Sequence, residues 1–165
     1  MISQEVLKIP NIIAFLSTIS YSEGTNNPNG YNTIFGGTVT KPNLFTSFAD
    51  HPRKIITING LSSDAAGRYQ IMSYVWDELK KDFIPNLPDF SPSNQDLAAC
   101  QLLSNYNSLD NVCNGQFAIT IDKLSRCWAS FPCADKGGSS FYSGQPSHSL
   151  QVLQTFYLTQ GGTIT

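Results

Sequence analysis

Apolar side chains recur at helical spacing near the start of the chain. Between residues 11 and 23 they occupy positions i, i+3, i+4 and i+7, which places them on one face of an amphipathic helix. These residues are Ile12, Phe15, Leu16 and Ile19. Asn11 is a candidate N-cap and Gly24 a candidate stop, because Asn accepts hydrogen bonds from free amides and Gly readily adopts the left-handed conformation. The pattern therefore predicts a first helix over residues 11–23.

The following segment has a different character. Residues 24–63 are rich in Gly, Asn, Pro and Thr, and they contain only short runs of β-forming side chains. The runs are Thr33–Phe35, Leu44–Phe48 and Lys54–Ile58. We expect a small, irregular sheet with long loops.

Helical periodicity returns after this segment and dominates the rest of the chain. One helix is predicted over Ala65–Asp82, another from Ser91 onward, and two more over 116–131 and Ser147–Gln160. A loop rich in Gly and Ser separates the last two, over residues 135–147. The order of elements predicts an α+β fold, mostly helical, with a small irregular β-sheet at one side.

Composition narrows the classes of function. The chain has 165 residues, a length that suits a single domain over residues 1–165. Charged residues make up 13%, against a usual share of about 25%, while 53 residues are Ser, Thr, Asn or Gln. The net charge is −2 and no apolar run approaches the ~20 residues of a membrane span, so we expect no nucleic-acid binding and no stable membrane association. The composition suits a soluble domain that handles a neutral, hydroxyl-rich ligand.

The cysteines and histidines form no recognisable metal or nucleophile motif. The cysteines are Cys100, Cys113, Cys127 and Cys133. They lack paired CxxC spacing, so we expect buried thiols, with a Cys127–Cys133 disulfide as the alternative outside the cytosol. His51 and His148 lie far apart, without HExxH spacing. We therefore expect no metal and no cofactor, and a metallopeptidase or a cysteine peptidase is disfavoured.

Glu23 is a candidate catalytic acid. It follows Ile19 by four residues on the apolar stripe, so its carboxyl group is expected to point toward the protein. It also precedes Gly24, at the negative end of the predicted helix. Desolvation and the helix dipole both raise the pKa of a carboxyl group, and an acid still protonated near neutral pH suits protonation of a glycosidic oxygen. The alternative is a solvated glutamate at a frayed helix end.

Short blocks of residues occur along the chain in an order that resembles the phage lambda endolysin family. They cover nearly the whole chain, from about Ile12 to Gly162. The blocks are Tyr21–Thr25, Tyr31–Asn32, Phe35–Gly37, Leu44–Thr46, Asp50–Lys54, Ala66–Gln70, Phe90–Pro92, Gln95–Asp96, Trp128–Pro132 and Tyr142–Pro146.

The resemblance implies a lysozyme-like fold in which the small sheet flanks an active-site cleft. It also implies a lytic transglycosylase that cuts the β-1,4 bond between N-acetylmuramic acid and N-acetylglucosamine in peptidoglycan. The family's catalytic acid falls on Glu23, and its tyrosine near the scissile bond falls on Tyr142. Phe141 competes with Tyr142, because the chain reads Tyr-Ser-Gly-Gln in place of the usual Tyr-Gly-Gln. Tyr69 and Gln70 are expected to open the helix after the sheet, beside the cleft, although core packing is the alternative for Tyr69.

The resemblance also assigns positions around the cleft. Ser22 neighbours the acid in the matching block, and Gln145 is expected to shape the lower lip. Trp128 lies in an apolar, helical stretch, so core packing is favoured over sugar stacking. Asp50–Arg53 is either a structural turn or part of the upper lip. The segment Asp135–Ser140 looks longer than the corresponding loop of the family.

One carboxylate is enough for the implied chemistry, because the attacking group is the 6-hydroxyl of the muramic acid. Glycosidases with two catalytic carboxylates need a partner about 5–9.5 Å away. Asp50 and Asp64 are the candidates, and neither has a setting that recommends it. The alternatives are a hydrolytic muramidase on the same fold and a non-catalytic, peptidoglycan-binding phage component.

The first twenty residues make a poor signal peptide. Lys8 is the only basic residue there, and Pro10 interrupts the apolar stretch. We expect the protein to accumulate in the host bacterial cytoplasm before lysis and to reach the cell wall through a membrane lesion made by another protein. We expect it to act as a monomer on the glycan strands of peptidoglycan.

Overall fold

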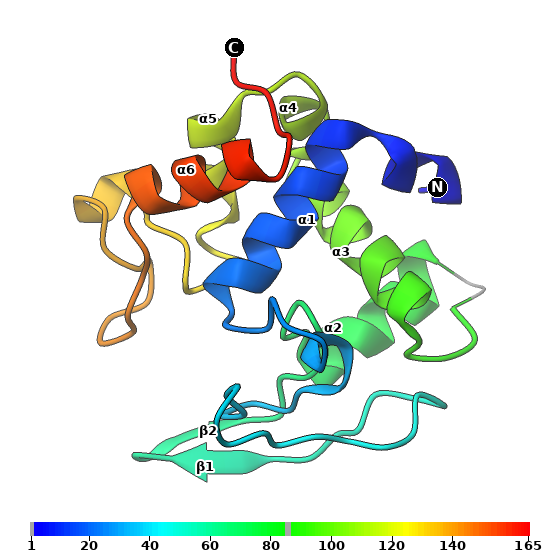
Figure 1. The fold of residues 1–165 in the computed structure, drawn as a ribbon. Helices are drawn as coiled ribbons and strands as arrows, with labels where there is room; N and C mark the ends of the chain where they lie inside the picture. Colours follow the sequence, from blue (N-terminus) through cyan, green and yellow to red (C-terminus); the bar gives the residue numbers. More distant parts are fainter. Residues whose placement is uncertain (1, 85–86) are drawn as a thin grey trace.

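The computed structural model describes residues 2–84 and 87–165, and Figure 1 shows a group of helices above a lobe of loops and two short strands. The helical group contains α1 (Pro10–Ser22), α3 (Pro92–Asn105), α4 (Leu109–Cys113), α5 (Phe117–Leu124) and α6 (Leu150–Thr159). The lobe contains β1 (Ile56–Ile58) and β2 (Leu61–Ser63), followed by α2 (Ser73–Glu78) and a π-helical turn, η3 (Leu79–Phe83). Short 3₁₀ turns are η1 (Gln4–Lys8), η2 (Gly30–Asn32) and η4 (Ala134–Lys136). The predicted α+β fold is confirmed.

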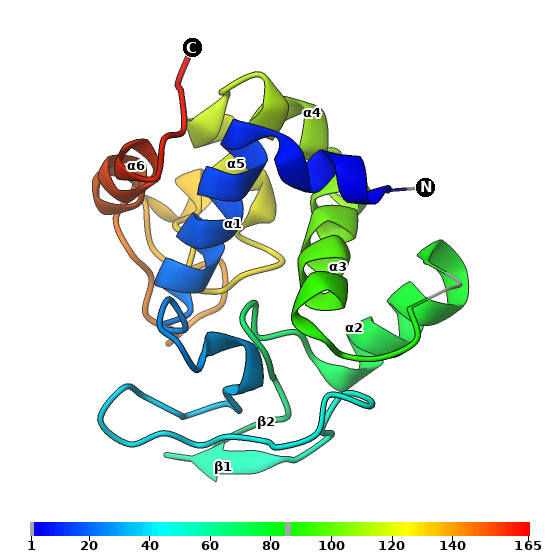
Figure 2. The same cartoon turned by 45° about the vertical axis from the view of Figure 1, so that its right-hand side comes forward.

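The central helix, α1, packs against α3, α4 and α6, and Figure 2 shows α3 and α6 on its two sides. The predicted face is buried, but the predicted N-cap is wrong. Pro10 occupies the first turn, where its missing N–H has no partner to lose, so Ile9 is the N-cap. Asn11 lies inside the helix, where its side chain donates to the Cys113 carbonyl and accepts from the Thr163 N–H.

The sheet is smaller than the predicted strands. Ile58 of β1 pairs with Leu61 of β2 across the Asn59–Gly60 turn, whose residues have φ of 51° and 81°. Asn-Gly favours this tight hairpin turn, because both positions require positive φ. The other two predicted runs form only isolated bridges, such as that between Thr33 and Leu44. The lobe is therefore mostly loop.

The helix predicted over Ala65–Asp82 is wrong in its first half. Ala66 and Ile71 exchange both backbone hydrogen bonds, at 3.0 and 2.9 Å, and so close a tight turn. Within it Gly67 has φ of 78° and Gln70 has φ of 47°, which are not helical values. Tyr69 and Gln70, expected to open a helix, therefore lie on this turn, and α2 begins only after it.

The helix predicted over 116–131 is likewise too long. α5 ends at Leu124, whose carbonyl oxygen accepts from both Cys127 N–H and Trp128 N–H, and the chain then turns through residues 125–131. The helix predicted from Ser91 onward is confirmed as α3, and the one predicted over Ser147–Gln160 is confirmed as α6. The short helix α4 was not predicted. Ser149, the N-cap of α6, accepts a side-chain hydrogen bond from Val152 N–H.

The buried hydrophobic side chains form one cluster that holds α1 to α5 and α6. Phe15 of α1 contacts Phe117, Phe131 and Tyr157 edge-on, with ring centroids 6.0 to 6.3 Å apart. The four cysteines are free thiols, so the Cys127–Cys133 disulfide is not formed. Within residues 2–84 and 87–165, no helix combines the length and apolar character needed to cross a bilayer.

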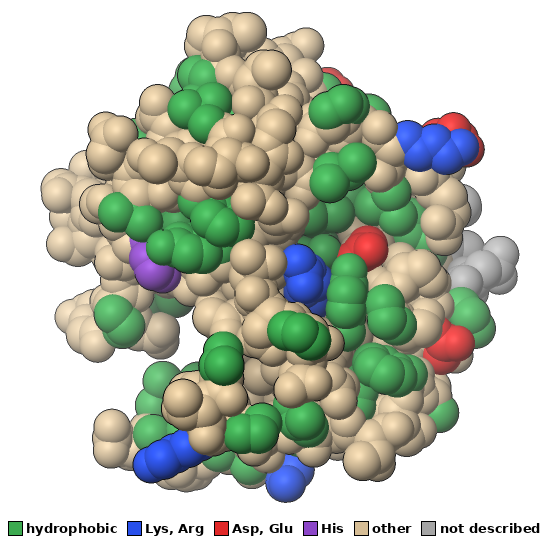
Figure 3. Space-filling view, in the orientation of Figure 1, with side chains coloured by type: hydrophobic (Ala, Val, Ile, Leu, Met, Phe, Trp, Pro, Cys, Tyr) green, Lys and Arg blue, Asp and Glu red, His purple; other side chains and the backbone are tan. Residues whose placement is uncertain are grey.

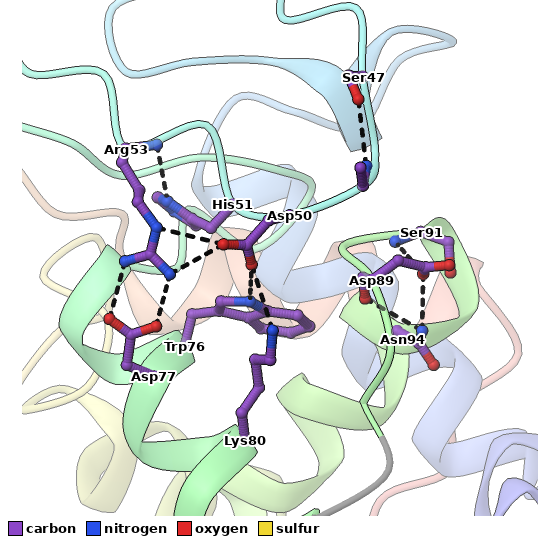
Figure 4. Close-up of polar contacts among 11 residues, drawn as sticks. Ser47, Asp50, His51, Arg53, Trp76, Asp77, Lys80, Asp89, Ser91 and Asn94 are labelled. Carbon is purple, nitrogen blue, oxygen red and sulfur yellow. Dashed lines mark hydrogen bonds and ion pairs between the residues drawn. The ribbon is translucent and has the colours of Figure 1, made fainter.

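A network of polar side chains fastens the lobe to α2 (Figure 4). Arg53 pairs with Asp77 at 2.6 Å and with Asp50 at 3.1 Å, and Asp50 accepts from Trp76 Nε1 at 3.0 Å. Burial alone would raise the pKa of Asp50. Hydrogen bonds from Trp76, the His51 N–H and Arg53 outweigh burial and lower that pKa to about 2. The arrangement favours the interpretation of this segment as a structural turn.

Candidate active site

Glu23 stands at the C-terminal end of α1, where the chain leaves the helix. Its N–H donates to the Ile19 carbonyl at 3.0 Å, and Gly24 then takes φ of 71°. Its half-buried carboxyl group accepts a 2.5 Å hydrogen bond from Ser130 Oγ at Oε1. Burial raises the pKa of Glu23 to about 7, against the opposing effect of the Ser130 hydrogen bond. Such a group is suited both to donate and to accept a proton near neutral pH.

A cavity of about 270 Å³ opens beside Glu23. Its walls come from both parts of the molecule: Phe35 and β2 from the lobe, Gln70 from the turn before α2, Trp128 from the turn after α5, and Gln145 from the loop before α6. Among the described residues that line it, Glu23 is the only acidic one. In Figure 3 the surface is indented on the left, between the lobe and the helical group.

A second cavity, of about 310 Å³, adjoins the first. Gln70, Met72, Cys127 and Trp128 line both. The second cavity is more aromatic and also carries charge: it is lined by Tyr74, Tyr106, Tyr142, Glu78 and Arg126. Because they share these four residues, the two cavities together form one groove.

Gln70 lies at the junction of the two cavities, as expected for a residue beside the cleft. Its Nε2 donates to the Gly67 carbonyl at 3.0 Å. This bond fixes the amide group, and Oε1 has no hydrogen-bond partner among the described residues. The side chain therefore presents an acceptor in a defined place, suited to an amide or hydroxyl donor.

Tyr69, by contrast, is a core residue. Its side chain is 1% exposed, its hydroxyl donates to Asp96 at 2.6 Å, and its carbonyl accepts from Trp128 Nε1 at 2.9 Å. Tyr69 is among the residues that line the second cavity, but its polar atoms are engaged inside the protein, so the substrate contact expected for its side chain stays a prediction. Trp128 is buried as predicted, and it forms part of the groove floor.

Of the other expected site residues, two line the groove and Ser22 lies behind it. Gln145 lines the cavity beside Glu23, whereas Tyr142 lines the second cavity and donates its hydroxyl proton to the Arg126 carbonyl at 2.7 Å. Phe141, the competitor of Tyr142, is not among the residues that line either cavity. Ser22 is buried and reaches Glu23 through Ser130, whose Oγ lies 2.9 Å from Ser22 Oγ.

Sequence reasoning missed the role of Ser130. It lies 107 residues from Glu23 in the sequence, and the predicted helix over 116–131 concealed the turn that brings it to the carboxyl group. Its place in the Trp128–Pro132 block was the one available signal. The tyrosines of the second cavity, Tyr74 and Tyr106, were also missed.

The candidate second carboxylates are engaged elsewhere. Asp50 belongs to the network around Arg53, and Asp64 accepts from both the N–H and the hydroxyl of Ser73. Neither lines the cavity beside Glu23. Across the described chain, no group of three or more His, Cys, Asp or Glu residues is arranged to hold a metal ion.

Comparison with known proteins supports the predicted resemblance. A family model described as Endolysin matches residues 13–164. The endolysin of Escherichia phage lambda is 38% identical over 158 residues, covering 92% of this chain and 91% of that protein. The endolysin of Escherichia phage P2 is 38% identical over 163 residues, covering 92% of this chain and 93% of that protein. A solved structure of bacteriophage lambda lysozyme complexed with a chitohexasaccharide superposes with a TM-score of 0.81 at 35% identity, covering 94% of this chain and 97% of the other.

The fold and groove are thus those of a lysozyme-like, peptidoglycan-cleaving enzyme. The chain belongs to the endolysin family. The sequence-based expectations of this family and of a lysozyme-like fold are confirmed.

Proposed function

We propose that the enzyme is a lytic transglycosylase, with Glu23 as its single catalytic acid and base. It cleaves the β-1,4 bond between N-acetylmuramic acid and N-acetylglucosamine in the glycan strands of peptidoglycan. The observation that carries this proposal is the cavity lining: among the described residues, Glu23 is the only acidic one beside this cavity, Asp50 and Asp64 are bonded elsewhere, and Glu78 lines the adjoining cavity instead. The absence of a second carboxyl group from the described lining of this cavity supports a mechanism with one enzyme carboxylate.

The reaction needs only one carboxyl group when the substrate provides the nucleophile. Glu23 donates its proton to the glycosidic oxygen, the bond from that oxygen to C1 of the muramic acid breaks, and N-acetylglucosamine leaves with a free hydroxyl. The 6-hydroxyl oxygen of the muramic acid then bonds to C1, and its proton passes to the Glu23 carboxylate. The product ends in a 1,6-anhydro ring, and Glu23 is protonated again. A pKa near 7 suits a group that must act first as acid and then as base.

The rest of the groove supplies binding. The proposed contacts are Gln70 with an acetamido group, Gln145 at the lower lip, and Tyr142 along the second cavity, with Ser22 acting behind the acid. Neutral hydrogen-bonding groups and aromatic rings suit an uncharged sugar chain. That lambda lysozyme was solved with a chitohexasaccharide supports an extended glycan in this groove. The proposal includes a monomeric enzyme that stays in the host cytoplasm until lysis and needs no cofactor.

Mass spectrometry of the products tests the proposal. Purified peptidoglycan is digested with the wild type and with Glu23→Gln, and the released muropeptides are compared. Products ending in 1,6-anhydro-muramic acid, absent with the variant, are the expected result. Reducing muramic ends, heavier by one water, would identify a hydrolytic muramidase on the same fold. Binding to peptidoglycan without any product from the wild type would identify a non-catalytic phage component.

A further inference from the structure

Two serine hydroxyls form a chain that ends on the Glu23 carboxyl group. Ser130 Oγ lies 2.5 Å from Glu23 Oε1 and 2.9 Å from Ser22 Oγ, and Ser22 Oγ lies 2.8 Å from the Ile19 carbonyl oxygen. Neither serine is among the residues that line the cavity beside Glu23. The two hydroxyls therefore act on the carboxyl group from within the protein, while the cavity lies beside it.

The number of hydroxyl protons limits which hydrogen bonds this chain can make at one time. A serine hydroxyl has one proton to donate and two lone pairs to accept with. Ser22 donates its own proton to the Ile19 carbonyl, so the single proton of Ser130 is shared between two acceptors, Ser22 Oγ and Glu23 Oε1. The contact with Glu23 is the shorter of the two, at 2.5 Å against 2.9 Å, and a carboxylate is a stronger acceptor than a neutral hydroxyl, so the Ser130 proton goes to Glu23 once that group is ionised.

We propose that Ser130, held by Ser22, is a positioning residue for Glu23: its hydroxyl occupies Oε1, directs the transferable proton to Oε2, and stabilises the carboxylate that remains after proton transfer. This inference rests on the role of Glu23 in the proposed function. When the proton moves from Oε2 to the glycosidic oxygen, the bond from Ser130 becomes a hydrogen bond to an anion, which is roughly twice as strong as a neutral one. It weakens again when the 6-hydroxyl of the substrate returns a proton.

The neighbouring titratable groups do not replace this interaction. Cys127, on the same turn as Ser130, interacts with the charge of Glu23, but burial raises the pKa of its thiol to about 12, so it stays neutral. On the other side of the turn, the His148 N–H donates to the Ser130 carbonyl at 2.9 Å, and the His148 ring lies 5.5 Å from that of Tyr21. Because both groups lie beside Ser130, the test observes Glu23 itself.

The test combines kinetics with direct titration of Glu23. For Ser130→Ala, kcat and KM are measured against pH on soluble glycan strands, and the Glu23 carboxyl carbon is followed by ¹³C NMR in the free enzyme. We expect the pKa of Glu23 and the basic limb of the rate profile to rise together by about one unit or more, because burial then acts unopposed. We expect kcat to fall about tenfold at its plateau with KM unchanged, since Ser130 does not line the cavity.

Three further variants identify the hydroxyl as the cause. Ser130→Thr keeps a hydroxyl and is expected to restore the wild-type pKa of Glu23. Ser22→Ala is expected to shift that pKa upward by less than Ser130→Ala. Ser125→Ala is the matched control, because Ser125 is a buried serine that donates to the Asp122 carbonyl at 2.7 Å and lines neither cavity. It should leave the pKa of Glu23 and the kinetics unchanged.

The outcomes separate this inference from the proposed function. An unchanged pKa of Glu23 and an unchanged basic limb in Ser130→Ala would overturn the inference, as would equal shifts in Ser130→Ala and Ser130→Thr. If Glu23→Gln retained turnover, the proposed function itself would fail. An inactive Glu23→Gln beside a normal Ser130→Ala would overturn the positioning role alone.

Discussion

Glu23 in the groove and Asp50 in the lobe are both partly withdrawn from water, yet their pKa values move in opposite directions, to about 7 and about 2. At Asp50, the Trp76 indole, a backbone amide and the Arg53 guanidinium all donate to the carboxylate. At Glu23 the neutral hydroxyl of Ser130 is the only side-chain donor among the described residues, and burial prevails. Burial decides the pKa at Glu23, which is left as an acid, whereas the number and charge of the donors decide it at Asp50, which anchors the fold.

The largest expected effect is on activity. Glu23→Gln keeps the shape of the side chain but removes the transferable proton, and it should slow cleavage by a factor of about 10² to 10⁴ or more. The clearing rate of a peptidoglycan suspension measures this. Glu5→Gln is the control, because it makes the same chemical change at an exposed residue that pairs with Lys8. A Glu23→Gln enzyme as active as this control would remove Glu23 from the mechanism.

Glu23→Gln should also change how the free energy of unfolding depends on pH. Because the folded pKa of Glu23, about 7, lies above its usual value of 4.5, the folded state binds the proton more tightly than the unfolded state does. The wild type should therefore lose stability as pH rises from about 4.5 through about 7. Glu23→Gln has no such titration, so at pH 8 its free energy of unfolding should exceed that of the wild type by up to about 2–3 kcal/mol. Urea unfolding of both proteins at pH 4, 6 and 8 gives the difference, and a difference independent of pH would contradict the buried acid.

A smaller effect on unfolding is expected in the lobe. Asp50→Ala removes the acceptor of Trp76 Nε1, which belongs to a fully buried side chain, and should cost about 1–3 kcal/mol of unfolding free energy. Asp77→Ala breaks only an exposed pair with Arg53 and should cost about 0–1 kcal/mol. Thermal unfolding of the two variants measures both values. Equal costs would show that the buried indole does not depend on Asp50.

The smallest expected effect is the acid dependence of the Asp50 network. The pKa of Asp50 is lower in the folded state than in the unfolded state. The stability that this carboxylate contributes is therefore present above about pH 4 and is lost as the pH falls through about 2. The Asp50 side chain is 43% exposed, so solvent screening limits the contribution to under about 1 kcal/mol. Comparison of the wild type with Asp50→Asn at pH 2 to 5 measures it. If the advantage of the wild type over Asp50→Asn in free energy of unfolding grew as the pH fell, the prediction would be contradicted.

The sequence predicts what local spacing determines. The stripe that ends at Ile19 located α1 and the inward direction of Glu23, because both follow from helical periodicity. Helical periodicity failed to predict the structure where distant residues determine the backbone conformation. The Ala66–Ile71 turn is closed by the pairing of its two ends and held by a bridge from Ala66 to Ile34 of the lobe, so Gln70 lies on a turn and not in the predicted helix. The contact between Ser130 and Glu23 has no local pattern at all, since it exists only after the turn beyond α5 packs against the end of α1.

The most direct measurement is the titration of Glu23 in the wild-type enzyme, by ¹³C NMR of its carboxyl carbon, assigned by its absence from Glu23→Gln. We expect a pKa near 7, far above that of an exposed glutamate. A value near 4.5 would contradict the account, because Glu23 would then be ionised at neutral pH and have no proton to donate.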